Sequence, residues 1–140
     1  GQISAIDYAE KMVKICKSKY THLPNVTFAV QQVETLDFPL QTFDAVTCFG
    51  LFPHLENKEE ALRQMNRVLK TKGKLIIAHA LSSTEIKEHH HNASSVVAHD
   101  VLPSLAVMKK LLTQAGFGKI QIIDKPGQYL NISIKLEKKE

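Results

Sequence analysis

Short apolar segments alternate with amphipathic segments from the start of the chain, and this order constrains the fold more than any other feature. Residues 3–6 are an apolar, strand-like run, and residues 12–20 repeat apolar side chains at helical spacing. Residues 26–30 are strand-like again. Strands that alternate with crossover helices form parallel sheets with helices on the sheet faces. The order therefore predicts an α/β fold.

The middle of the chain continues this pattern. Residues 43–49 are almost continuously apolar, which is typical of a parallel strand covered on both faces and predicts a position near the middle of the sheet. Asn57 and Glu60 have the spacing of a capping box, which predicts a helix that starts there and whose apolar stripe continues through Leu69 until Gly73 stops it. Residues 75–78 predict another buried strand.

The periodic pattern is lost between residues 82 and 103, where we expect an inserted loop or lid with a helical turn at 84–90. Ser104 then predicts the start of a helix that ends at Gly116. Residues 120–123 and 130–136 alternate as strands joined by a turn. The chain is therefore expected to end in an antiparallel strand pair.

Composition predicts one domain over residues 1–140, because 140 residues with 44% hydrophobic side chains can bury one substantial core. We expect no membrane partner and a cytoplasmic location, since there is neither a secretory signal nor an apolar run of about 20 residues. The net charge of +4 includes lysines on a helix face, so we expect no nucleic-acid partner. Cys16 and Cys48 lie in apolar patterns and predict reduced thiols.

Four phrases resemble landmarks of the class I S-adenosylmethionine-dependent methyltransferases, in particular the methyltransferase type 11-like domain. They are residues 3–7, 43–46, 67–75 and 112–117, and they occur in the family's order. The resemblance implies a Rossmann-like class I methyltransferase sheet, mostly parallel with an antiparallel C-terminal strand pair. It also implies S-adenosyl-L-methionine as the cofactor, bound across the carboxyl ends of the strands. The family's first strand and glycine-rich turn precede the first phrase, so we expect a partial domain with the first strand missing.

The resemblance assigns the ribose of the cofactor to Asp7, which stands where the family ends its second strand on an acidic residue. A carboxylate suits this role because its two oxygens can accept from both ribose hydroxyls. The neighbouring Tyr8 is included in the same cofactor site. The alternative interpretation of Asp7 is a helix N-cap, with Glu10 at the box position.

Further cofactor contacts follow from the ends of the next two strands. Gln32 stands where the family often places an aspartate, and its side-chain carbonyl can accept from the adenine amino group. Val33 could offer its backbone amide to the ring, and Glu34 belongs to the same segment, although an exposed strand end is the alternative. Phe49 and Gly50 resemble the end of the fourth strand, which lines the cofactor and substrate cavity in the family.

Catalytic and metal-binding residues are less defined by the sequence. His54 follows the fourth-strand phrase and is the candidate for an orienting residue or a catalytic base. His89, His91 and His99 form an alternative metal site with Asp100, since imidazole and carboxylate groups are good ligands. We favour the interpretation of this segment as a lid rather than as a metal site, because adjacent histidines do not easily face one ion.

The resemblance implies methyl transfer to an unidentified small-molecule acceptor. Because the first strand is missing, this expectation includes the case in which the partial domain alone is inactive. The alternatives are a non-catalytic binding or scaffold domain derived from the methyltransferase fold, and an NAD-dependent oxidoreductase, which also ends its second strand on an acidic residue. A homodimer or strand swap could compensate for the missing strand.

Overall fold

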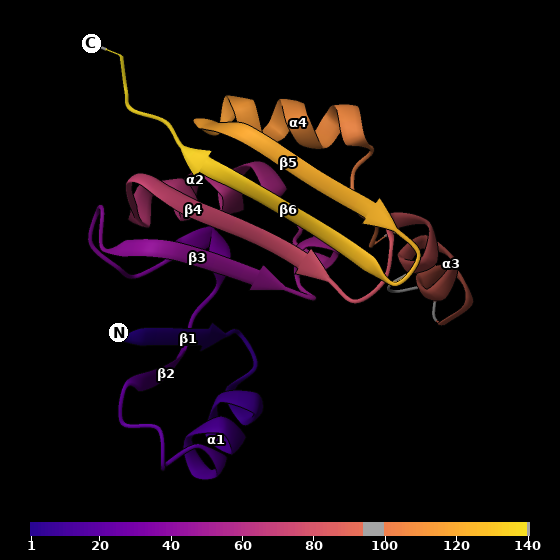
Figure 1. The fold of residues 1–140 in the computed structure, drawn as a ribbon. Coiled ribbons are helices and arrows are strands. Elements are labelled where there is room, and N and C mark those ends of the chain that lie inside the picture. The colour runs from indigo at the N-terminus through magenta and orange to yellow at the C-terminus, as the bar shows by residue number, and fades with distance from the viewer. Residues whose placement is uncertain (94–99, 140) are drawn as a thin grey trace. The chain divides into compact units, whose positions relative to one another are not determined.

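The computed structural model describes residues 1–93 and 100–139 (Figure 1). The chain forms two compact units, Gly1–Asp37 and Phe38–Glu140. The strands form a two-stranded sheet in the first unit and a four-stranded sheet in the second. All six predicted strands are present, although those predicted at residues 75–78 and 120–123 are longer in the structure.

The first unit is a parallel strand pair connected by a helix. β1 (Ile3–Asp7) and β2 (Val26–Val30) pair in register from Ile3 with Val26 to Asp7 with Val30. α1 (Glu10–Lys19) connects them and buries Val13. The short 3-10 helix η1 (Val33–Thr35) follows β2. Because the two strands are parallel and in register, their carboxyl ends lie side by side.

The second unit is a four-stranded sheet with the order β3-β4-β6-β5. Its strands are β3 (Phe43–Phe49), β4 (Leu69–His79), β5 (Phe117–Lys125) and β6 (Gln128–Lys135). β3 is parallel to β4, whereas β6 is antiparallel to both β4 and β5. The structure therefore has the predicted α/β class, with parallel strands first and an antiparallel C-terminal pair.

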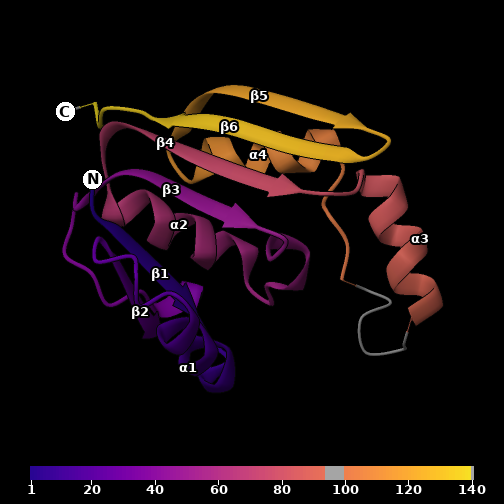
Figure 2. The ribbon, with the colours of Figure 1, turned by 60° about the horizontal axis from the view of Figure 1, so that its bottom comes forward.

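Two helices lie along one face of this sheet (Figure 2). They are α2 (Lys58–Val68) and α4 (Leu105–Gln114). Both begin at the predicted caps, where Asn57 Oδ1 accepts from the Glu60 amide at 3.0 Å and Ser104 Oγ accepts from the Val107 amide at 3.3 Å. The core of this unit includes buried apolar side chains of the two helices and of β4: Ala61, Leu62, Met65, Val68, Met108, Leu112, Leu75 and Ile77. Burial of each larger side chain contributes about 1.5–3 kcal/mol.

The predicted position of residues 43–49 in the middle of the sheet is wrong within the second unit. β3 is the edge strand of the four-stranded sheet, and Cys48 is its only buried residue. An apolar run reports which faces of a strand are apolar, but it carries no information about which backbone edge is paired. The run therefore predicted the strand correctly and its place in the sheet incorrectly.

The helix predicted to continue to Gly73 ends earlier. α2 ends at Val68, and β4 begins with the next residue, Leu69. Gly73 lies inside β4, where a Cβ atom would be only 2.7 Å from the Lys70 oxygen and 3.0 Å from the Asp44 oxygen. Glycine is needed at this position because the neighbouring backbone approaches closely, and not because a helix stops there.

Strand β6 has a polar buried side, and part of it compensates for an irregularity in β5. The register of β5 against β6 shifts between Gly118 and Gln121, and Lys119 has a positive φ of 48°. Asn131 Nδ2 donates to the Gln121 oxygen at 3.1 Å, and also to Ser133 Oγ at 3.1 Å. The side chain of Asn131 thus satisfies a carbonyl beside the bulge.

The predicted loop or lid at residues 82–103 contains a helix, α3 (Ser83–Ala93), that is longer than the predicted turn. A reciprocal capping box starts it: Ser82 N donates to Glu85 Oε2 at 2.9 Å, and Glu85 N donates to Ser82 Oγ at 3.1 Å. Glu85 Oε2 also accepts from the Gly127 amide at 3.0 Å, and Asp124 Oδ1 accepts from the Ser83 amide at 2.8 Å. The first turn of α3 is therefore attached to the β5–β6 turn.

The function of this segment as a lid stays a prediction, and residues 94–99 of it lie outside the described residues. Within the described ranges, no helix has the length and apolar character that crossing a membrane requires.

Candidate functional site

The first unit brings five of the predicted cofactor residues to one edge of its sheet. Asp7 pairs with Val30 at the last position of the β1–β2 ladder, and the Gln31 amide donates to the Asp7 oxygen at 3.0 Å. Asp7 ends β1 and Tyr8 follows it, while Gln32, Val33 and Glu34 follow β2. The carboxyl ends of parallel strands are where open α/β sheets bind ligands.

The carboxylate of Asp7 is half-buried and is held from one side. Its Oδ1 accepts a hydrogen bond from the Ala9 amide at 2.8 Å. The N-cap of α1 is Ala9, so the alternative in which Asp7 itself is the N-cap is wrong. Among the described residues, no group donates to Asp7 Oδ2. The carboxylate is therefore oriented by its own loop and still presents an acceptor oxygen.

The segment after β2 has one glutamine that is used by its own loop and one that is not. Gln31 Oε1 accepts from the Asp37 amide at 2.9 Å. Gln32 is the N-cap residue of η1, makes no side-chain cap, and is exposed. Tyr8, on the other strand end, is 70% exposed. These two side chains border the Asp7 edge without being part of the core.

The second unit places the remaining cofactor candidates at the carboxyl end of β3. Phe49 is 67% exposed, and the Gly50 amide donates to the Ala78 oxygen of β4 at 3.0 Å. Gly50 has a φ of +66°, and a Cβ atom there would meet no atom within 4 Å. The backbone conformation favours glycine, and the space beside it is open to a ligand.

Three ionisable side chains meet at the loop that follows Gly50: His54, Lys58 and Asp100. Nδ1 of His54, in the 3-10 helix η2 (Phe52–His54), is 2.8 Å from Oδ2 of Asp100. Lys58 Nζ donates to the oxygens of Pro53 at 3.2 Å and Leu55 at 2.9 Å. Burial lowers the pKa of Lys58, and the nearby charge of Asp100 opposes that shift. The sequence identified His54 as a candidate but did not predict its contact with Asp100 or the hydrogen bonds from Lys58 to the backbone beside it.

The thiol of Cys48 lies at the end of the same strand but is not a candidate nucleophile. Its side chain is buried, and burial raises the pKa of the thiol to about 12, although a backbone hydrogen bond to Phe52 opposes the shift. A thiol with such a pKa is almost entirely protonated near neutral pH.

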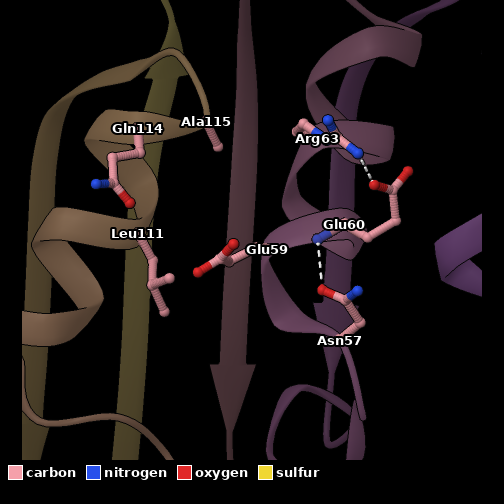
Figure 3. Close-up of a pocket in the computed structure, with 7 residues that line it drawn as sticks. All are labelled: Asn57, Glu59, Glu60, Arg63, Leu111, Gln114 and Ala115. Carbon is pink, nitrogen blue, oxygen red and sulfur yellow. Dashed lines mark hydrogen bonds and ion pairs between the residues drawn. The ribbon is translucent and has the colours of Figure 1, made fainter.

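A groove of about 230 Å³ lies between α2 and α4 (Figure 3). Its lining comes from the first turns of α2 and the end of α4: Asn57, Glu59, Glu60, Arg63, Leu111, Gln114 and Ala115. Glu60 forms an ion pair with Arg63. None of the predicted site residues lines this groove, so it is distinct from the candidate site.

The alternative metal site is tested only in part. Among the described side chains, no group of three histidine, cysteine, aspartate or glutamate residues is arranged to hold an ion. His89 is described and exposed, whereas the side chain of His91 and the whole of His99 lie outside the described residues.

The fold and the strand ends together define a Rossmann-like α/β protein of the methyltransferase type. Two solved structures have this fold: the YcgJ protein from Bacillus subtilis, with a TM-score of 0.81, 17% identity and coverage of 98% of this chain and 83% of that one, and a SAM-dependent methyltransferase from Thermotoga maritima, with a TM-score of 0.74, 17% identity and coverage of 96% and 82%.

Residues 1–77, more than half of the chain, match the family described as a methyltransferase domain, and the chain belongs to this family. It is 27% identical to the ubiquinone/menaquinone biosynthesis C-methyltransferase UbiE of Hydrogenovibrio crunogenus, over 95% of this chain and 59% of that protein. It is 35% identical to UbiE of Teredinibacter turnerae, over 81% and 45%. The chain thus spans about half the length of these curated relatives. The cofactor of such methyltransferases is S-adenosyl-L-methionine.

Proposed function

We propose that this chain binds S-adenosyl-L-methionine and functions in methyl transfer to a small-molecule acceptor. When bound, the cofactor supplies a methyl group on a positively charged sulfur, which a nucleophile displaces. The observation that carries the proposal is Asp7, a half-buried carboxylate that is oriented by the Ala9 amide at the carboxyl end of β1. Its acceptor oxygens fit the two hydroxyls of a ribose.

The adenine of the cofactor is assigned to the loop after β2. Gln32 is exposed and has a side-chain oxygen that can accept from the adenine amino group. Val33 begins η1, and its amide is the donor assigned to the ring, with Glu34 beside it. The exposed ring of Tyr8 provides an apolar surface at the same edge.

The amino-acid end of the cofactor is assigned to Phe49 and Gly50. The open space beside Gly50 allows a ligand to approach the backbone, and the exposed Phe49 ring offers an apolar contact. Positioning of the methyl donor and the acceptor supplies much of the rate in such a transfer. The acceptor itself is not defined by these residues.

Calorimetric titration of the 140-residue chain with S-adenosylmethionine, S-adenosylhomocysteine and NAD tests this proposal. We expect both sulfur ligands to bind and NAD not to bind. Asp7→Asn keeps an oxygen for the Ala9 amide but removes the charge, so we expect affinity to fall roughly tenfold or more, because a hydrogen bond to a charged group contributes about 1.5–3 kcal/mol.

The matched control is Asp37→Asn, which removes an exposed carboxylate from the same unit and should leave the affinity unchanged. Binding of NAD in preference to S-adenosylhomocysteine would support the oxidoreductase alternative instead. A folded chain that binds none of these ligands would contradict the proposal.

The proposal includes a cytoplasmic location and no nucleic-acid or membrane partner. A homodimer or strand swap stays a prediction. Light scattering of the purified chain tests it, because a dimer has twice the mass of the 15.7 kDa chain.

A further inference from the structure

His54 and Asp100 form a side-chain pair that connects two loops 46 residues apart in the sequence. The imidazole Nδ1 is 2.8 Å from the carboxylate Oδ2. His54 lies in η2, only a few residues after Gly50 at the carboxyl end of β3, and Asp100 lies shortly before α4. The pair therefore belongs to the side of the second unit to which the proposed function assigns the cofactor's amino-acid end.

The backbone on both sides of His54 is held as well. Lys58, the first residue of α2, donates to the Pro53 oxygen and to the Leu55 oxygen, the two carbonyls that flank the histidine. Its ammonium group also lies 5.9 Å from the centroid of the buried Phe52 ring. A lysine at the first turn of a helix opposes the helix dipole. The two hydrogen bonds from Lys58 to the η2 backbone offset this unfavourable interaction with the helix dipole.

The geometry determines which ring nitrogen carries the proton in a neutral imidazole. An ionised carboxylate only accepts hydrogen bonds, so His54 Nδ1 must be the donor to Asp100. The unprotonated nitrogen of the neutral ring is then Nε2. The side chains of His54 and Asp100 have relative exposures of 36% and 32%, so a ligand can reach the ring.

We propose that His54 accepts the proton that the methyl acceptor loses, and that Asp100 is the positioning residue that holds the imidazole for this step. The inference rests on the proposed methyl transfer. As the acceptor atom uses an electron pair to bond the methyl carbon, the carbon–sulfur bond breaks and its electron pair stays on sulfur. The acceptor's proton moves to His54 Nε2, and the carboxylate of Asp100 balances the charge of the resulting imidazolium.

This arrangement selects a class of substrate. A base is useful only when the nucleophilic atom carries a hydrogen that it must lose, as in a hydroxyl, an amine N–H or an acidic C–H group. Acceptors without such a hydrogen, for example thioethers or tertiary amines, gain nothing from the pair.

Nitrogen-15 NMR of histidine-labelled protein tests the role of Asp100 without requiring the acceptor. His54→Asn identifies the His54 signals among those of the seven histidines. We expect neutral His54 to carry its proton on Nδ1 in the wild type, a mixture of both tautomers in Asp100→Asn, and the wild-type tautomer in Asp100→Glu. Glu56→Gln, which removes an exposed carboxylate two residues from His54, should leave the tautomer unchanged. A proton on Nε2 in the wild type, or no change in Asp100→Asn, would overturn the inference.

Diethyl pyrocarbonate, which modifies unprotonated imidazole nitrogens, probes the proton-accepting nitrogen directly. We expect Asp100→Asn to slow the modification of His54 severalfold, measured by mass spectrometry, while exposed His22 in the other unit reacts at an unchanged rate. Equal rates for His54 in both proteins would overturn the role of the pair. Calorimetry with S-adenosylhomocysteine separates the two proposals. If the wild-type chain does not bind this ligand, the methyltransferase proposal is contradicted, whereas the NMR result on the His54–Asp100 pair still stands.

Discussion

The ammonium group of Lys135 on β6 lies 2.7 Å from the backbone oxygen of Asn66 on α2. It also donates to the Leu69 oxygen at 2.6 Å, where α2 has ended and β4 begins. The last carbonyls of a helix have no partner within the helix, and a cation at this end interacts favourably with the helix dipole. A strand from the C-terminal end of the chain therefore completes a helix in its middle.

Removal of this ammonium group should destabilise the second unit. Lys135→Met retains most of the side-chain volume but removes the charged donor from both carbonyl oxygens, and the Asn66 oxygen keeps only the Leu69 amide. We therefore expect a loss of about 2 kcal/mol in the free energy of unfolding. Urea denaturation followed by circular dichroism measures it. Lys138→Met, at an exposed position close by, should change stability by less than about 0.5 kcal/mol. Equal effects of the two substitutions would contradict the capping role.

The attachment of α3 to the β5–β6 turn should depend on pH. The amides of Gly127 and then Ser82 donate to Glu85 and hold the pKa of its carboxyl below its ordinary value of 4.5. A carboxyl with a lower pKa in the folded state stabilises the fold above its unfolded pKa, and this contribution is lost as the pH falls through the folded value. We therefore expect the Gly127 amide to lose protection from hydrogen exchange below about pH 4.5. In Glu85→Gln the protection should be weak at every pH, and an unchanged acid dependence in that variant would count against the assignment.

Alanine should be tolerated differently at two glycines. At Gly73 the new Cβ atom would be 2.7 Å from the Lys70 oxygen, so backbone must move, and we expect a cost of about 3 kcal/mol. At Gly50 the space is open and only the positive φ is unfavourable, which costs about 1 kcal/mol. Thermal denaturation of both variants compares the costs. A larger loss of stability for Gly50→Ala than for Gly73→Ala would show that the backbone around Gly73 can move to make room for the Cβ atom.

The two thiols should react at very different rates in the native protein. Cys48 is buried and the pKa of its thiol is raised to about 12, whereas Cys16 is partly exposed on α1. A disulfide reagent such as Ellman's reagent should therefore modify one thiol rapidly and the second only after unfolding. Cys16→Ser should abolish the rapid reaction, and rapid labelling that persists in this variant would mean that Cys48 is accessible.

The sequence predicts the elements of this fold well because their signals are local. Side chains close in sequence determine a cap such as Asn57 or Ser104, and the structure confirms both caps. The end of α2 was predicted too late because Leu69 continues the apolar helical spacing. Its conformation depends instead on pairing with Phe43 of β3 and on Lys135, neither of which is near it in the sequence.

In the candidate site, too, the sequence predicts the residues with local signals and misses those that depend on distant contacts. The resemblance to the family identifies Asp7 and Gly50 because each occupies a fixed place at a strand end. The sequence offered Asp100 only as a ligand of the alternative metal site, since nothing local connects it to His54, its partner 46 residues away. No sequence motif points to Lys58, and only its contacts with the Pro53 and Leu55 oxygens reveal its role.

The bulge in β5 also limits how the sequences of related proteins can diverge. The side-chain amide of Asn131 donates to the Gln121 oxygen beside the bulge. A β5 strand of regular length would shift that carbonyl and leave the buried amide with only one of its two acceptors, Ser133 Oγ. Conversely, an apolar side chain at position 131 would leave the Gln121 oxygen unsatisfied. The extra residue in β5 and the asparagine in β6 should therefore be gained or lost together during evolution, as a covarying insertion and substitution.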